Sequence, residues 1–190
     1  MEAFLVSTGV VALAEMGDKT QLLSLMLAAR FRRPLPIILG IFVATLVNHA
    51  FAGALGAWVT QQFGHDVMRW VLGLSFIAMA IWTLIPDKLD EREGRGSPLL
   101  GVFGTTVLAF FLAEMGDKTQ VATVALAAQY SAFVAVVLGT TLGMMLANVP
   151  AVLLGERVTR KIPIRAIHAV AAAIFLVLGL LALFDVGSLL

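Results

Sequence analysis

Two copies of one eight-residue stretch, AEMGDKTQ, place acids and a lysine inside segments that are otherwise apolar. The stretch occupies residues 14–21 and recurs without change at residues 113–120. In each copy a glutamate and an aspartate are three residues apart, so on a continuous helix their carboxylates lie on one face, about one turn apart. The copies together offer four carboxylates, those of Glu15, Asp18, Glu114 and Asp117. Such oxygens suit hard cations such as Ca2+, Mg2+ and Mn2+.

Other polar side chains near the acids can support a cation site. Hydroxyl and amide oxygens within the two stretches come from Thr20, Gln21, Thr119 and Gln120. Each glutamine follows its aspartate by three residues, which extends the polar face by one further turn. Two asparagines lie outside the stretches, Asn48 and Asn148. We expect these mainly to form hydrogen bonds between helices, with ion contact as the second role.

The stretches also contain a lysine and a glycine whose roles have two interpretations each. Lys19 and Lys118 directly follow the aspartates and are therefore rotated off the carboxylate face. Each lysine can pair with an acid of the other copy, which we favour, or act as a tethered internal cation when the site is empty. Gly17 and Gly116 allow either close helix packing or a local break that exposes backbone carbonyls to an ion.

The composition is that of an integral membrane protein. Hydrophobic residues make up 60% of the 190 residues and charged residues only 13%, and the mean hydropathy is +0.97. Both values lie outside the usual range of soluble proteins. A spanning helix needs about 20 mostly apolar residues. Six runs meet this need, at about 3–29, 35–60, 67–85, 99–128, 132–155 and 165–184.

An internal repeat organises these six runs. Shifting the sequence by 99 residues aligns the two acidic stretches, Leu39-Gly40 with Leu138-Gly139, and Phe76 with Phe175. Each half then holds three spanning segments, and an odd number makes the second half enter the membrane from the opposite side. The expected fold is all-α, with six transmembrane helices in two inverted three-helix repeats. One transmembrane domain comprises repeats at 1–86 and 99–190, joined by a linker at 87–98.

Basic residues predict the orientation. Three loops on one face hold ten of the thirteen basic residues: Arg30, Arg32, Arg33, Lys88, Arg92, Arg95, Arg157, Arg160, Lys161 and Arg165. The opposite face holds only Arg69. Positive residues favour the cytoplasmic side. We therefore expect a multi-pass protein of the cell membrane whose linker is cytoplasmic and whose termini are both extracytoplasmic.

The acids are expected near the middle of the bilayer. At about 1.5 Å per residue, Glu15 lies about 18 Å from the outer end of its segment, and Glu114 is at a similar depth from the cytoplasmic end. An ionised acid there costs about 2.5–3.5 kcal/mol. Protonation, pairing with the lysines or a bound cation can each offset this cost. With all six charged groups ionised the sum is −2, which complements one divalent cation.

Both motif copies resemble the signature of a known transporter family. The residues Glu15-Met16-Gly17-Asp18-Lys19-Thr20 and 114–119 match a duplicated E-x-G-D-(K/R)-(T/S) pattern. It is typical of divalent-cation transporters that include bacterial manganese exporters and Golgi manganese/calcium–proton antiporters, within the lysine-exporter superfamily. The resemblance implies export of Mn2+, or Ca2+ in some members, against protons and without a prosthetic group. By position it makes Glu15, Asp18, Glu114 and Asp117 the ligands, supported by Thr20 and Thr119.

Other functions fit the sequence less well. An acidic cavity also suits a cationic organic solute such as lysine, which is the main alternative. An enzyme is disfavoured because the sequence shows no histidine-rich metal pair and no nucleophilic serine motif, and it contains no cysteine. A net charge of +1 without a broad basic patch gives no reason to expect a nucleic-acid partner. The expected partners are the lipid bilayer and divalent cations, and the oligomeric state is left open.

Overall fold

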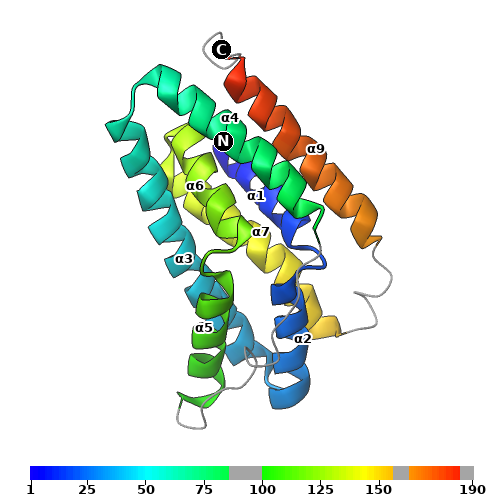
Figure 1. Cartoon of the computed structure of the whole chain (residues 1–190). Coiled ribbons are helices and arrows are strands. Elements are labelled where there is room, and N and C mark those ends of the chain that lie inside the picture. The colour runs from blue at the N-terminus through cyan, green and yellow to red at the C-terminus, as the bar shows by residue number, and fades with distance from the viewer. Residues whose placement is uncertain (86–99, 156–162, 185–190) are drawn as a thin grey trace.

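The computed structural model describes residues 1–85, 100–155 and 163–184, and this part of the chain is entirely helical, without strands (Figure 1). The predicted linker at 87–98 and the basic segment around 157–161 lie outside the described residues. The eight helices are α1 (Glu2–Glu15), α2 (Lys19–Phe31), α3 (Pro34–Gln62), α4 (His65–Thr83), α5 (Gly101–Glu114), α6 (Lys118–Tyr130), α7 (Phe133–Leu154) and α9 (Ile164–Leu183).

The predicted apolar runs coincide with these helices, but two of the six are broken. Helices α3, α4, α7 and α9 are each long and apolar enough to cross a membrane. The first run is divided into α1 and α2, and the fourth into α5 and α6, with both breaks inside the repeated acidic stretch. Helices of 13 or 14 residues are about 20 Å long, shorter than a hydrocarbon core of about 30 Å.

Contacts between the two halves of the chain hold the bundle together. Helix α1 packs on α7, α3 packs on both α5 and α6, and α4 packs on α9. Figure 1 shows α4 and α9 as a neighbouring pair beside α1 and α6, while α2 and α5 extend toward the opposite end. The acidic stretches therefore lie where the upper and lower short helices meet.

Equivalent glycines allow equivalent close contacts in the two halves. A Cβ atom added to Gly40 of α3 would lie 3.1 Å from the backbone oxygen of Phe103 in α5. One added to Gly139 of α7 would lie 2.6 Å from the backbone oxygen of Phe4 in α1. Gly139 lies 99 residues after Gly40, and Phe103 lies 99 residues after Phe4, so the two contacts are equivalent in the repeat. The same sequence feature thus brings two helix backbones together twice.

The α4–α9 pair breaks this equivalence. Phe76 and Phe175, which correspond in the repeat, stack with ring centroids 6.4 Å apart and planes inclined by 25°. Around this contact, α9 packs against α1 and α4 packs against α6, whereas neither makes more than marginal contact with α2 or α5 in the described part of the chain. The pair therefore covers one end of the bundle and leaves the other end uncovered.

Replacing Gly56 by alanine should lower stability, because its Cβ would overlap the backbone oxygen of Val124 where α3 meets α6. We expect a loss of about 1–3 kcal/mol, typical of overpacking. Gly9→Ala is the matched control, since no atom lies within 4 Å of its added Cβ and alanine favours a helix by up to about 1 kcal/mol. Thermal unfolding in detergent measures both, and equal midpoints for the two variants would contradict the packing argument.

Candidate functional site

A type II β-turn breaks the first helix in its acidic stretch. Glu15 ends α1, Met16 has φ −64° and ψ 116°, and Gly17 has φ 86°. The Asp18 N–H donates to the Glu15 carbonyl at 3.1 Å, which closes the turn. A type II turn needs a positive φ at its third position, and glycine adopts this without steric cost. The glycine of the motif is therefore the residue that breaks the helix.

The second copy folds in the same way. Met115 has φ −67° and ψ 117°, Gly116 has φ 77°, and the Asp117 N–H donates to the Glu114 carbonyl at 3.1 Å. Identical local sequences thus give identical turns although their surroundings differ. No atom lies within 4 Å of a Cβ added to Gly116. The turn therefore comes from the local sequence and is not forced by neighbouring helices.

These turns correct the expectation that glutamate and aspartate share one face of a continuous helix. Each glutamate is instead the last residue of one helix, and each aspartate is the N-cap of the next. The carboxylate of Asp18 accepts a bond from the Lys19 N–H at 2.8 Å. An acid is favourable at a helix N-terminus and unfavourable at a C-terminus, where the dipole is already negative. The two glutamates therefore make these helix ends attractive to a cation.

The two glutamines stabilise the turns and do not extend the acidic face as the sequence suggested. The side-chain oxygen of Gln21 accepts a bond from the Gly17 N–H at 3.0 Å. Gln120 does the same for Gly116 at 2.8 Å. The amide nitrogen of Gln21 also donates to the Ala147 carbonyl at 3.0 Å, which fixes the first turn against α7. Each glutamine side-chain oxygen thus accepts a hydrogen bond from the glycine N–H of its own turn.

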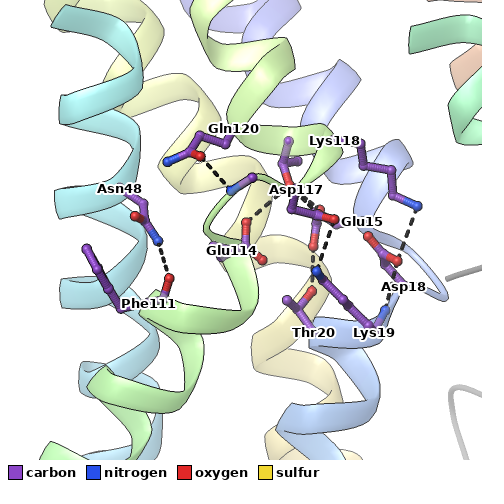
Figure 2. A network of polar contacts seen from close by, with 12 residues as sticks. Glu15, Asp18, Lys19, Thr20, Asn48, Phe111, Glu114, Asp117, Lys118 and Gln120 are labelled. Atoms are coloured by element: carbon purple, nitrogen blue, oxygen red, sulfur yellow. Dashed lines mark hydrogen bonds and ion pairs between the residues drawn. The ribbon is translucent and has the colours of Figure 1, made fainter. Parts of the chain in front are cut away.

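Three of the four acids converge at the centre of the bundle. One carboxylate oxygen each from Glu15, Glu114 and Asp117 lies within 4.8 Å of the other two, and all three side chains are buried. Figure 2 shows these carboxylates pointing toward one another. Asp18 is also buried but does not belong to this three-carboxylate cluster. Oxygens so close together can all contact one ion at about 2.3–2.6 Å.

The cluster is electrostatically unfavourable without positive charge. Two unit charges 4.8 Å apart repel by about 3.5 kcal/mol at an effective dielectric constant of about 20. Three such pairs give about 10 kcal/mol, comparable to the whole stability of a typical domain. Positive charge from the motif lysines, from a bound cation or from protons must therefore accompany these carboxylates.

A threonine hydroxyl at the centre shows how crowded the oxygens are. Thr119 Oγ1 lies 2.8 Å from Glu15 Oε1, 3.1 Å from Glu114 Oε2 and 3.2 Å from Asp117 Oδ2. A hydroxyl carries one hydrogen, so it donates only one of these three bonds. At the other two contacts, a proton on a carboxyl group or a bound cation would stabilise the approach of the oxygens. Thr20 adds one bond to the Glu15 carboxylate, at 2.6 Å.

Each motif lysine pairs with the aspartate of the other repeat. Lys19 Nζ lies 3.2 Å from Asp117 Oδ1, and Lys118 Nζ lies 3.2 Å from Asp18 Oδ1. Pairing across the repeats was the interpretation favoured from the sequence. Both contacts appear in Figure 2. They place the two lysines around the cluster and join the two broken helices.

The two asparagines form hydrogen bonds between helices, as expected. Asn48 of α3 donates to the Phe111 carbonyl of α5 at 3.2 Å. Asn148 of α7 accepts from the Ser24 hydroxyl of α2 at 2.8 Å. Asn148 also donates to the Met144 carbonyl of its own helix at 3.1 Å. These contacts support the short helices on either side of the breaks.

Sequence reasoning missed a contact that covers the first turn. His168 lies on α9 with Nε2 2.7 Å from the Met16 carbonyl oxygen. Ile164 lies so close to Gly17 that an added Cβ would be 3.0 Å from its Cδ1 atom. No repeat signal marked these residues, because the equivalent turn at Gly116 has no such neighbour.

Comparison with known proteins identifies the family. The chain matches the family described as divalent cation/proton antiporter GDT1 over residues 3–91 and 102–188. The chain belongs to this family. The family consists of transporters and not of enzymes, so the expectation of a membrane transporter from the repeated signature is confirmed. No solved structure gives a significant match to the chain.

Individual relatives in the family extend over nearly the whole chain. A Vibrio cholerae protein named "Putative manganese exporter" is 52% identical over 185 residues, which cover 97% of this chain and 92% of the relative. A GDT1-like protein of Synechocystis is 26% identical over 92% of this chain and 93% of its own length. GDT1-like protein 3 of rice is 26% identical over 92% of this chain and 71% of its own length.

The turn geometry predicts how substitutions at Gly116 affect this family member. Because no neighbour lies within 4 Å of an added Cβ, Gly116→Ala should cost only the strain of a positive φ, about 1–2 kcal/mol. Gly116→Asn should cost less, because asparagine tolerates this conformation better. Thermal midpoints in detergent should decrease in the order wild type, Gly116→Asn, Gly116→Ala. An alanine variant as stable as wild type would show that the helix is not broken here.

Proposed function

We propose that this protein exports Mn2+ from the cytoplasm in exchange for protons, with Ca2+ as the second candidate cargo. The observation that carries the proposal is the buried three-carboxylate cluster of Glu15, Glu114 and Asp117, with Asp18 beside it. The cluster lies where two helix C-termini and two helix N-termini meet, an arrangement that suits ion binding within a membrane. The family description and the name of the Vibrio cholerae relative agree with it.

The proposed topology is six spans in two inverted repeats, at 1–86 and 99–190. Each pair of short helices, α1 with α2 and α5 with α6, forms one broken span, because either helix alone is too short to cross. This places the turns at the middle of the membrane. The arginine-rich loops lie in the cytoplasm and both termini lie outside. The equivalent glycine contacts of α3 and α7 support this symmetry.

The proposed mechanism is alternating access around the central site. The α4–α9 pair packs on α1 and α6, which form the extracytoplasmic half in this topology, and it leaves α2 and α5 uncovered. In the proposed cycle this arrangement represents a state closed toward the outside. Rocking of the repeats would transfer the pair's contacts to the other half. Protons entering from outside would then displace the ion from the carboxylates.

Proton exchange is supported by the hydrogen-bond count around Thr119. The Thr119 hydroxyl has one hydrogen for three close carboxylate contacts, so a proton or a cation would stabilise the other two. Protons and Mn2+ therefore compete for the same oxygens, which is the requirement for antiport through one site. Thr20 and Thr119 would support the bound ion directly. Gln21, Gln120, Asn48 and Asn148 would support it through the backbone that they hold.

Transport by purified protein in proteoliposomes tests this proposal. Mn2+ added outside should enter, and a trapped pH dye should report a rise in internal pH as protons leave in exchange. Asp117→Asn should lower the Mn2+ flux at least about 100-fold, because a ligand contributes more than the 10- to 100-fold typical of groups behind the ligands. Asp66→Asn is the control, since this exposed acid begins α4 away from the cluster, and it should keep wild-type flux.

Two results would contradict the proposal. Normal Mn2+ flux through Asp117→Asn would show that the three-carboxylate cluster does not bind the transported ion. If lysine is transported and Mn2+ is not, the acids bind an organic cation and the metal-ion proposal is wrong. Three carboxylates within 4.8 Å of one another fit a bare ion better than a solute with an alkyl chain, so we expect lysine neither to move nor to compete.

Single cysteines test the orientation, because the wild-type chain contains none. We expect a membrane-impermeant maleimide to label Gln62→Cys, at the end of α3, in intact cells. Arg33→Cys, at the start of α3, should be labelled only after the membrane is permeabilised. Both positions are exposed, so burial does not bias the comparison. The reverse pattern would invert the proposed topology and place the side of Lys19 outside the cell.

A further inference from the structure

The two lysine–aspartate pairs have the same geometry but different access to solvent. Both N–O distances are 3.2 Å, yet the Lys19 side chain is 17% exposed and the Lys118 side chain is fully buried. The eight-residue stretches that contain the two lysines are identical, so the difference comes from what packs around them and not from the stretches themselves. In this conformation only one of the two equivalent cations can be reached.

The position of the α4–α9 pair explains the difference. Lys118 begins α6, on which α4 packs, whereas Lys19 begins α2, which neither α4 nor α9 covers appreciably. The turns agree with this, because each lysine reaches across to the turn of the other copy: Lys118 pairs with Asp18 at the first turn and Lys19 pairs with Asp117 at the second. α9 covers the first turn through Ile164 and His168, while Met115 of the second turn is 54% exposed. The accessible side of the centre is therefore the side of Lys19, which is the cytoplasmic side in the proposed topology.

The partner of Lys19 is also a member of the three-carboxylate cluster. Asp117 contacts Lys19 through Oδ1 and lies beside Thr119 through Oδ2. Asp18, the partner of the buried Lys118, is outside the cluster. An ion bound to Glu15, Glu114 and Asp117 would therefore lie close to the ammonium group of Lys19 and repel it. Lys118 would remain with Asp18, away from the ion.

We propose that Lys19 is the charge filter of the cytoplasm-facing site, a tethered cation that an entering ion must displace from Asp117. A monovalent ion brings no more charge than the ammonium group that it replaces, and it cannot gain from the exchange. A divalent ion brings twice the charge to the same oxygens and displaces the lysine. After the repeats rock, Lys118 and Asp18 take over these roles on the outer side. This inference rests on the proposed export of a divalent cation.

Mn2+ binding to purified protein and its competition by Na+ test the filter. Lys19→Gln should bind Mn2+ about 10-fold more tightly, because no cation has to leave, and turnover in proteoliposomes should fall. Na+ should compete with Mn2+ in this variant and not in wild type. Lys19→Arg keeps the charge and should keep wild-type discrimination. Unchanged or weaker Mn2+ binding by Lys19→Gln, without Na+ competition, would overturn the proposal and leave Lys19 a structural ion pair.

Lysine labelling of the wild-type protein gives an independent readout that does not depend on the folding of a variant. Mn2+ should accelerate acylation of Lys19, measured by mass spectrometry, because the displaced ammonium group becomes more exposed. Lys118 should stay unlabelled with or without Mn2+. Slower labelling of Lys19 with Mn2+ would overturn the filter. If wild type neither binds nor transports Mn2+, the proposed function fails instead, so the two failures can be told apart.

Discussion

Charge buried at the centre of an apolar bundle is the constraint on which the rest of this structure depends. Four acids and two lysines come together there, and none of them is tolerated in this environment alone. Each repeat brings acids that the other repeat neutralises, through Lys19 on Asp117 and Lys118 on Asp18. The cluster therefore requires the two halves to assemble around each other. The close backbone contacts at Gly40 and Gly139 are what make that approach possible.

Breaking the helix has a second effect, which is to bring oxygen atoms together inside an apolar bundle. A continuous helix uses nearly all its backbone groups internally. The turns at Gly17 and Gly116 end one helix on a glutamate and begin the next on an aspartate, so negative charge and helix ends are brought to the same point. The glutamine of each motif holds the turn by bonding the glycine N–H. The two identical stretches of this chain thus fold into one and the same local geometry.

Much of the fold was predictable from hydropathy and the repeat, because apolar runs of this length have few alternatives in lipid. The positions of the helices and the membrane class followed directly. The break inside the acidic stretch was only one of two interpretations of Gly17, since a glycine also suits close packing. The order glycine then aspartate favours the break, because glycine suits the turn and aspartate suits the N-cap of the next helix. The cover of the first turn by Ile164 and His168 was not predictable, because it exists in only one of two equivalent positions.

The dominance of contacts between the halves has a consequence for biosynthesis. Helix α1 finds its main partner in α7, and α3 finds its partners in α5 and α6, so the first half has almost no core of its own. In the proposed topology, Glu15 and Asp18 reach the membrane while the ribosome is still making the second half, before the side chains that later neutralise them exist. The nascent first half would therefore wait in a polar or protein-lined environment, such as the insertion machinery, until α6 with Lys118 and then α7 have been made. Release into lipid before that point would expose unpaired acids and favour degradation.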